Sequence, residues 1–323
     1  MSIHSNKLWS KTIALDVGGS HVSASLIDVR SGGKECLGIV RKPLDAFDQP
    51  SKIIQQIVAC IEEAAVGERP SVIGIAFPGP FNYKTGVSAV ANVGGKFEKM
   101  YGLHVKQALL DIFDTDHTTI RFANDAHCFA IGAAHSYRLK QKASLFLTLG
   151  TGFGSAFIVN GQLQEEHPAF NGTGGFFHHS FLTGTADDYF STRWFLQQYQ
   201  QRTGAKVESV KEMATTVTDD SAEIFNDFGN NLGHFLNNYL QDYDCEELIL
   251  GGSISKSAHL FLPGLQEQLR SSNRQIDITF CDDTEECILV GAAILAGQQH
   301  QQETGRKAKN EKRKASQPLL PLR

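Results

Sequence analysis

Short apolar runs that end in glycine alternate along the chain with stretches whose apolar residues recur at helical spacing. The runs 13–17 and 22–28 predict two strands joined by a glycine turn, and the runs 72–77 and 119–125 predict two more. Between them, the apolar residues of 54–65 recur every three or four positions, which predicts a helix. Similar patterns predict an alanine-rich helix over 126–136, two strands joined by a glycine turn within 143–159, an amphipathic helix over 221–243, a strand that ends at Gly251 and a small-residue helix over 287–297. Strands that alternate with helices indicate an α/β architecture.

Residues 15–26 and 147–158 repeat one pattern. Both segments share the order of apolar positions, two glycine-bearing turn positions and a Ser-Ala pair. Two similar strand–turn–strand units indicate a duplicated fold with a cleft between the halves. The match is short, and a match of this length also arises by chance.

Three glycine turns follow apolar runs, at 16–20, 150–154 and 251–253, and each contains a hydroxyl residue or adjoins one. Glycine permits positive φ and lacks the Cβ that would keep a backbone N–H away from a phosphate oxygen. A tight hairpin also needs glycine, but three such turns in one chain favour phosphate binding. The chain has no GxxxxGK[ST] loop, and GTGFG leads into the strand-like SAFIV rather than a helix, which argues against Walker A and Rossmann sites.

Two carboxylates stand at the ends of predicted strands. Asp16 directly precedes the first glycine turn, where it suits Mg²⁺ beside bound phosphates, or else caps the turn. Asp125 follows Asn124 at the end of the strand over 119–125. A carboxylate there suits a general base toward a hydroxyl nucleophile, with Asn124 orienting the substrate; the alternative is an ordinary helix N-cap.

Composition narrows the classes of partner. The chain has 323 residues with 35 acidic and 30 basic side chains, and 7 of the basic but only 2 of the acidic ones lie in 303–323. The acidic body argues against a nucleic-acid partner, and we expect 303–323 to be a disordered basic tail.

Cysteine usage bears on the compartment. The six cysteines are irregularly spaced without a CxxC, and the first residues lack an apolar signal core, so we expect a reducing, cytoplasmic protein. The uncharged run 143–159 is interrupted by glycines, so we expect no membrane partner.

Five segments together resemble the ROK family of sugar kinases, within the actin/hexokinase/Hsp70 superfamily. They are ALDVGGSHVSASLID, GIAFPGPFNYKTGV, RFANDAHCFAIGAA, LTLGTGFGSAFIVNG and LILGGSIS, and the resemblance runs from Thr12 to Gly297. It implies two ribonuclease-H-like (actin-like ATPase) domains that flank a central cleft. The first would be 1–122, completed by a helix at 287–300, and the second 123–286.

The resemblance also assigns roles to residues. It implies Asp125 as catalytic base, Asp16 as metal ligand, Asn92 and Asn124 as sugar contacts, Gly18, Gly19 and Ser20 as the first phosphate loop, Gly150, Thr151 and Gly152 as the second, and Gly251 and Gly252 as nucleotide contacts.

One region departs from the family pattern. The family has a Gly-Glu-Ile-Gly-His stretch whose Glu and His contact the sugar, followed by a cysteine-rich zinc loop and a further Glu. This chain has 174–179 without a Glu, and no cysteine between Cys128 and Cys245, so we expect no zinc. His178 or His179 would stand for the family's His and Asp187 for the later Glu, unless the histidine pair belongs to a partly buried aromatic-rich loop.

The resemblance therefore implies a homodimer that transfers the ATP γ-phosphate to a sugar hydroxyl, most simply of a hexose such as glucose, with Mg²⁺. Two alternatives stay open, a non-catalytic sugar sensor and a kinase that uses polyphosphate as donor. A regulator with an N-terminal helix-turn-helix is disfavoured, because few residues precede Asp16.

Overall fold

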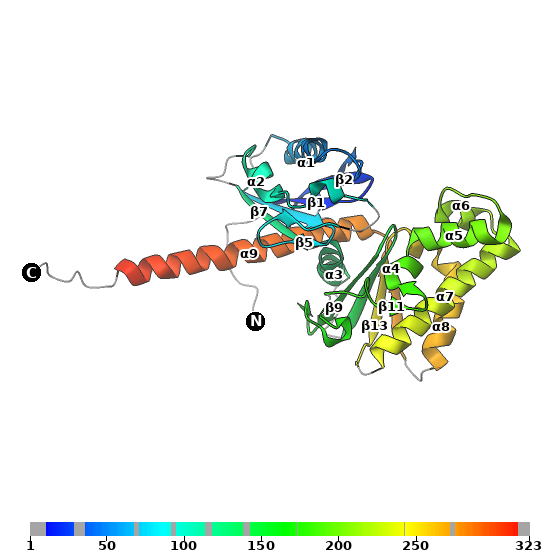
Figure 1. Cartoon of the computed structure of the whole chain (residues 1–323). Helices are drawn as coiled ribbons and strands as arrows, with labels where there is room; N and C mark the ends of the chain where they lie inside the picture. Colours follow the sequence, from blue (N-terminus) through cyan, green and yellow to red (C-terminus); the bar gives the residue numbers. More distant parts are fainter. Residues whose placement is uncertain are drawn as a thin grey trace, which may run out of the picture. The chain divides into compact units, whose positions relative to one another are not determined.

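The computed structural model describes residues 11–28, 36–67, 71–91, 95–113, 118–137, 143–172, 174–241, 243–271 and 275–315. Two compact units divide the chain (Figure 1). One unit runs to Cys128 and takes in the chain from Leu289 onward, and the other is Phe129–Ile288.

The first unit is built on a five-stranded sheet. In spatial order its strands are β3 (Val40–Pro43), β2 (His21–Ile27), β1 (Thr12–Val17), β4 (Val72–Phe77) and β7 (Thr119–Asn124). β2 is antiparallel to both of its neighbours, whereas β1, β4 and β7 are parallel. Helix α1 (Pro50–Ala65) packs on β1, β2 and β3 through a stripe of buried isoleucines, because its apolar residues recur at helical spacing.

The second unit repeats this topology. Its sheet has the order β10 (Gln162–Leu163), β9 (Phe153–Val159), β8 (Ser144–Leu149), β13 (Glu247–Gly251) and β14 (Asp277–Phe280), with the same sequence of antiparallel and parallel pairs. The repeated order agrees with the duplication that the sequence indicates. The two hairpins differ by one residue, because Leu15 pairs with Ala24 whereas Leu147 pairs with Ser155.

The other elements complete the two units. They are β5 (Phe81–Asn82), β6 (Val87–Ser88), η1 (Glu98–Met100), α2 (Val105–Leu110), α3 (Asp125–Ser136), η2 (Pro168–Phe170), β11 (Ser180–Phe181), β12 (Gly184–Thr185), α4 (Ala186–Tyr189), α5 (Thr192–Thr203), α6 (Val210–Thr215), α7 (Asp219–Leu240), η3 (Ile254–Ser257), α8 (Ala258–Ser271) and α9 (Thr284–Ala315). No helix in the described ranges is long and apolar enough to cross a membrane.

Aromatic side chains dominate the core of the second unit. Helices α7 and α8 lie side by side (Figure 1), and Gly229 of α7 faces the backbone carbonyl of Phe261 so closely that a methyl group would overlap it. Phe190, Phe228 and Phe235 are fully buried against this pair and the sheet. The core therefore depends on a glycine that lets two helix backbones approach each other.

The C-terminal segment differs from the expectation. We expect a helix at 287–300 followed by disorder over 303–323, but α9 continues to Ala315, and residues 316–323 lie outside the described residues. Lys, Arg, Glu, Gln and Ala are good helix formers, and the first proline after α9 begins is Pro318, so the local sequence favours the longer helix.

Candidate functional site

The carboxyl ends of β1, β4 and β7 bring the first group of predicted residues to one edge of the first sheet. Asp16 pairs with Ala76, and Ala76 pairs with Ala123, so these three residues are level across the sheet. Neighbouring strands lie about 4.8 Å apart, which puts the ends of β1 and β7 roughly 10 Å apart. The edge therefore places the carboxylates Asp16 and Asp125 within reach of one small ligand.

The first glycine turn lies at this edge, and two of its backbone N–H groups are available to bind a ligand. Gly18 N donates to His21 O over 2.9 Å, while the carbonyl oxygens of Gly19 and Ser20 accept from Ala46 N (3.1 Å) and Leu44 N (3.0 Å). In the described part of the chain, no group accepts a hydrogen bond from the N–H of Gly19 or Ser20. The turn can therefore donate two hydrogen bonds to an anion.

Asn124 is the last residue of β7 and directly precedes helix α3. Its Oδ1 accepts hydrogen bonds from Ala126 N (3.0 Å) and His127 N (3.2 Å), and its Nδ2 donates to Tyr83 Oη over 3.1 Å. Tyr83 in turn donates to Phe77 O over 3.2 Å. Asn124 is thus the N-cap of α3, and its amide also interacts with the Asp125 carboxyl, where it opposes the rise in pKa.

Asp125 follows at the first position of α3. Its Oδ1 accepts from Ala126 N over 2.9 Å. Burial raises the pKa of the Asp125 carboxyl above its usual value, and backbone hydrogen bonds oppose that rise. A carboxylate with a raised pKa is a stronger base, which suits proton transfer from a hydroxyl group.

Asp16 is the predicted metal ligand at this edge of the sheet. It is half-buried at the end of β1, beside the turn, and both Asp16 and Asp125 act on the buried Cys128 thiol, whose pKa is raised by burial and then by these two charges. Within the described residues no three His, Cys, Asp or Glu side chains group as a metal site. Mg²⁺ typically binds one or two carboxylates together with substrate phosphates, so Asp16 fits such an ion and no protein-only cage.

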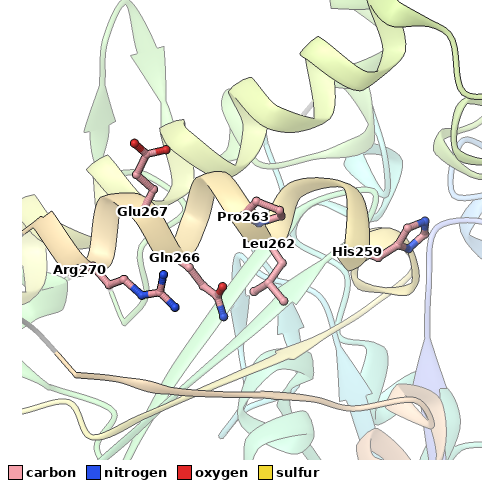
Figure 2. Close-up of a pocket in the computed structure, with 6 residues that line it drawn as sticks. All are labelled: His259, Leu262, Pro263, Gln266, Glu267 and Arg270. Carbon is pink, nitrogen blue, oxygen red and sulfur yellow. The ribbon is translucent and has the colours of Figure 1, made fainter.

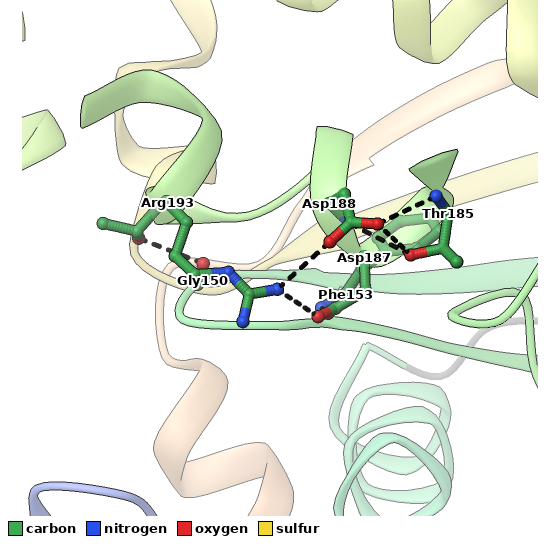
Figure 3. Close-up of polar contacts among 7 residues, drawn as sticks. Gly150, Phe153, Thr185, Asp187, Asp188 and Arg193 are labelled. Atoms are coloured by element: carbon green, nitrogen blue, oxygen red, sulfur yellow. Dashed lines mark hydrogen bonds and ion pairs between the residues drawn. The ribbon is translucent and has the colours of Figure 1, made fainter. Parts of the chain in front are cut away.

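The second glycine turn is held by Asp187, whose contacts Figure 3 shows, and by Thr192. Asp187 Oδ1 accepts from Phe153 N over 2.8 Å, and its Oδ2 pairs with Arg193 over 2.6 Å. Thr192 donates to Gly150 O through both its N (2.8 Å) and its Oγ1 (3.0 Å). Asp187, which the resemblance assigns to the sugar, therefore has contacts that favour anchoring the turn 150–152.

The two histidines have different surroundings. His179 is buried, and its Nε2 lies 3.0 Å from Phe170 O; burial lowers the pKa of its imidazole. His178 is exposed, with its ring centroid 3.9 Å from that of Phe177. These contacts favour the aromatic-core alternative for His179 and leave His178 as the candidate for a substrate contact.

The third glycine turn packs against the second. A methyl group on Gly252 (φ 95°) would overlap Leu149 O, and one on Gly150 would lie 3.7 Å from Ser253 Oγ. Gly252 N donates to Thr284 Oγ1 over 2.8 Å, so that N–H is already used. The glycines at 251–252 are required for this close approach whether or not a nucleotide binds.

One predicted residue cannot be placed, and several residues that contact the site are not indicated by the sequence. Asn92 lies outside the described residues. Tyr83, Arg193 and Thr284 hold the site residues but carry no local signal, since each bonds to a residue distant in sequence or in another element. Lys96 lies against Gly19, and the glycine pair before it is the one signal that could have pointed to it.

A separate hollow of about 490 Å³ lies along helix α8 (Figure 2). Its lining residues all belong to that helix: His259, Leu262, Pro263, Gln266, Glu267 and Arg270. None is a predicted site residue. The hollow is therefore a groove on one helix surface, distinct from both glycine-turn regions.

Comparison with known proteins supports the resemblance. A family model described as ROK family matches residues 12–299. The N-acetyl-D-glucosamine kinase of Histophilus somni (strain 129Pt) is 26% identical over 269 residues, covering 76% of this chain and 85% of that protein. A ROK family glucokinase from Streptomyces griseus, in complex with glucose and AMPPNP, has a TM-score of 0.74 at 20% identity, covering 89% of this chain and 99% of that one. An inorganic polyphosphate/ATP-glucomannokinase from Arthrobacter sp. strain KM has a TM-score of 0.65 at 22% identity, covering 90% and 100%.

Proposed function

Because this chain belongs to the ROK family, we propose that it transfers the γ-phosphate of ATP to a hydroxyl group of a hexose or an N-acetylated hexosamine. The observation that carries the proposal is the carboxyl edge of the first sheet. There a glycine turn with two available N–H groups stands beside Asp16, and the half-buried carboxyl of Asp125 lies two strands away. Phosphate contacts, a metal ligand and a base are the groups that phosphoryl transfer requires.

Each of these groups has one task in the proposed reaction. The N–H groups of Gly19 and Ser20 bind phosphate oxygens, and Asp125 accepts the proton of the sugar hydroxyl as its oxygen bonds to phosphorus. Asp16 would hold Mg²⁺, which when bound neutralises part of the phosphate charge. Such catalysis consists mainly of positioning and charge neutralisation.

The identity of the sugar that accepts the phosphate depends on the relatives and on the stretch 174–179. Curated relatives named as N-acetyl-D-glucosamine kinases favour an N-acetylated hexosamine, and the resemblance to glucokinases favours glucose. The stretch 174–179 has no Glu, so it lacks a charged acceptor for ring hydroxyls. From the resemblance alone we propose Asn124 and His178 as sugar contacts, and a correspondingly broad selectivity.

The proposal extends to the setting of the reaction. The six cysteines are buried and form no disulfide bond with one another, which supports a reducing, cytoplasmic compartment. The homodimer that the resemblance implies stays a prediction, and sedimentation of the purified protein would test it.

The decisive experiment is a coupled ADP-release assay over glucose, mannose and their N-acetylated amino derivatives, with polyphosphate as an alternative donor followed by sugar-phosphate detection. We expect turnover with ATP, and glucose and N-acetylglucosamine within about 10³-fold of each other in kcat/KM. A pocket built around one matched polar contact rejects the wrong substrate by about 10⁴–10⁵-fold. Sugar binding in calorimetry without turnover of any sugar would replace the kinase with a sensor, and turnover with polyphosphate alone would replace the donor.

A further inference from the structure

The segment 95–97 is tied to the first glycine turn by backbone hydrogen bonds. Ala46 N donates to Gly19 O over 3.1 Å, and Phe97 N donates to Ala46 O over 2.7 Å. Phe97 is buried, and the N–H of Gly95 donates to Glu98 Oε1 over 3.0 Å. The residue between Gly95 and Phe97 is therefore fixed beside the turn by its neighbours on both sides.

That residue is Lys96, and its side chain runs along Gly19. A methyl group on Gly19 would lie 3.6 Å from Cδ, 3.7 Å from Cε and 3.8 Å from Nζ of Lys96. A lysine at a protein surface usually extends its ammonium group into water. Here the half-buried Lys96 instead directs its ammonium against the backbone of the turn.

Two independent features thus make the turn attractive to an anion. The N–H groups of Gly19 and Ser20 have no acceptor within the described ranges, and the Lys96 ammonium adds a full positive charge at the same place. A lysine is a compact point charge that binds phosphate in this way.

We propose that Lys96 is a catalytic residue of the phosphoryl transfer, whose ammonium binds a terminal phosphate oxygen of the nucleotide at the turn 18–20. The proposal rests on the proposed function, in which this turn holds the phosphates of ATP. In the transfer, the bond from Pγ to the ADP oxygen breaks, a bond from Pγ to the sugar oxygen forms, and the hydroxyl proton passes to Asp125. The Lys96 ammonium offsets the charge that gathers on the ADP and phosphoryl oxygens.

The test compares Lys96→Met and Lys96→Arg with the control Lys52→Met, which removes an exposed lysine of the same unit. We expect Lys96→Met to lower kcat/KM for ATP by about 10²–10³-fold, the usual effect of losing one group that stabilises transition-state charge. Lys96→Arg should recover part of that loss because it restores the charge, and Lys52→Met should stay within about twofold of wild type. Equal thermal unfolding midpoints of the variants establish that they fold, and Lys96→Gln replaces Lys96→Met if the latter does not.

The outcomes separate this proposal from the proposed function. A loss below about threefold in Lys96→Met, or in Lys96→Gln, overturns the assignment of Lys96. If the wild-type protein phosphorylates no sugar, the kinase proposal fails, and calorimetric titration with AMPPNP then tests Lys96 separately. Weaker AMPPNP binding in the Lys96 variant, but not in Lys52→Met, would keep Lys96 as a phosphate contact. If neither Lys96→Met nor Lys52→Met changes the affinity for AMPPNP, the assignment of Lys96 as a phosphate contact is overturned.

Discussion

Replacing the half-buried carboxyl of Asp125 with an amide separates its chemical role from its structural one. In Asp125→Asn the amide oxygen can still accept the hydrogen bond from Ala126 N, which spans 2.9 Å in the wild type. Helix α3 should therefore begin as before. The amide cannot take a proton from a sugar hydroxyl, so the reaction loses its base.

The expected loss of activity follows from general-base catalysis. Such a base contributes about 10²–10⁴-fold to the rate. At 1.36 kcal/mol per factor of ten, this equals about 3–5 kcal/mol of activation free energy. We expect kcat to fall by this factor while nucleotide affinity stays within about twofold.

The same substitution should lower activity but raise the stability of the folded protein relative to wild type. Burial raises the pKa of Asp125 in the folded protein, whereas in the unfolded chain an Asp titrates near 3.9. Between these two values the unfolded state is ionised and the folded state is protonated, so wild-type stability falls as pH rises from about 4. An Asn side chain does not titrate. We therefore expect Asp125→Asn to gain stability relative to wild type with rising pH.

The measurements are a coupled ADP-release assay and thermal unfolding at pH 4 to 8, with Asp111→Asn as control because Asp111 is an exposed carboxylate of the same unit. Retention of more than about a third of the wild-type rate would remove Asp125 from the mechanism. A midpoint difference between Asp125→Asn and wild type that stays constant with pH would refute the argument from burial.

Three further predictions concern packing, metal content and the C-terminal segment. Gly229→Ala should lower the free energy of unfolding by about 1–3 kcal/mol, because its methyl group would overlap Phe261 O between α7 and α8. The control is Asn238→Ala at an exposed position of the same helix, and an unchanged thermal midpoint of Gly229→Ala would contradict the packing. Purified protein should contain no stoichiometric zinc, and a chelator should not change its melting; metal analysis by mass spectrometry checks this, and one zinc per chain would show it wrong. Truncation after Gln302 should leave kcat within about twofold of wild type, since the predicted site residues precede it, and a large fall in the ADP-release assay would count against this.

The sequence predicts backbone features better than side-chain roles. Strand β1 and the turn after it follow from an apolar run that ends in two glycines, and the observed strand Thr12–Val17 agrees with the prediction. The repeat of this hairpin at β8 and β9 is also visible in the sequence. The one-residue shift in strand pairing is not visible, because the pairing register depends on the conformation and length of the turn between the strands.

Roles that depend on distant partners could not be predicted in this way. Asp187 of helix α4 anchors a turn by accepting a hydrogen bond from Phe153 N in strand β9, and nothing near Asp187 in the sequence indicates that bond. His179 lies in an aromatic core that several separate elements build. The extension of α9 is hard to predict for a different reason: a charged composition is typical of disordered segments, although the same residues are good helix formers.

Helix α9 has a consequence for the order in which a newly synthesised chain can fold. From Leu289 onward it groups with the first unit, where the backbone of Ala292 lies so close to Gly74 of β4 that no Cβ fits between them. A ribosome therefore completes all of Phe129–Ile288 before it delivers the helix that covers Gly74. Domains generally fold from the N-terminus as they emerge. In this chain the N-terminal unit instead lacks the helix that packs on Gly74 until the central unit has been synthesised.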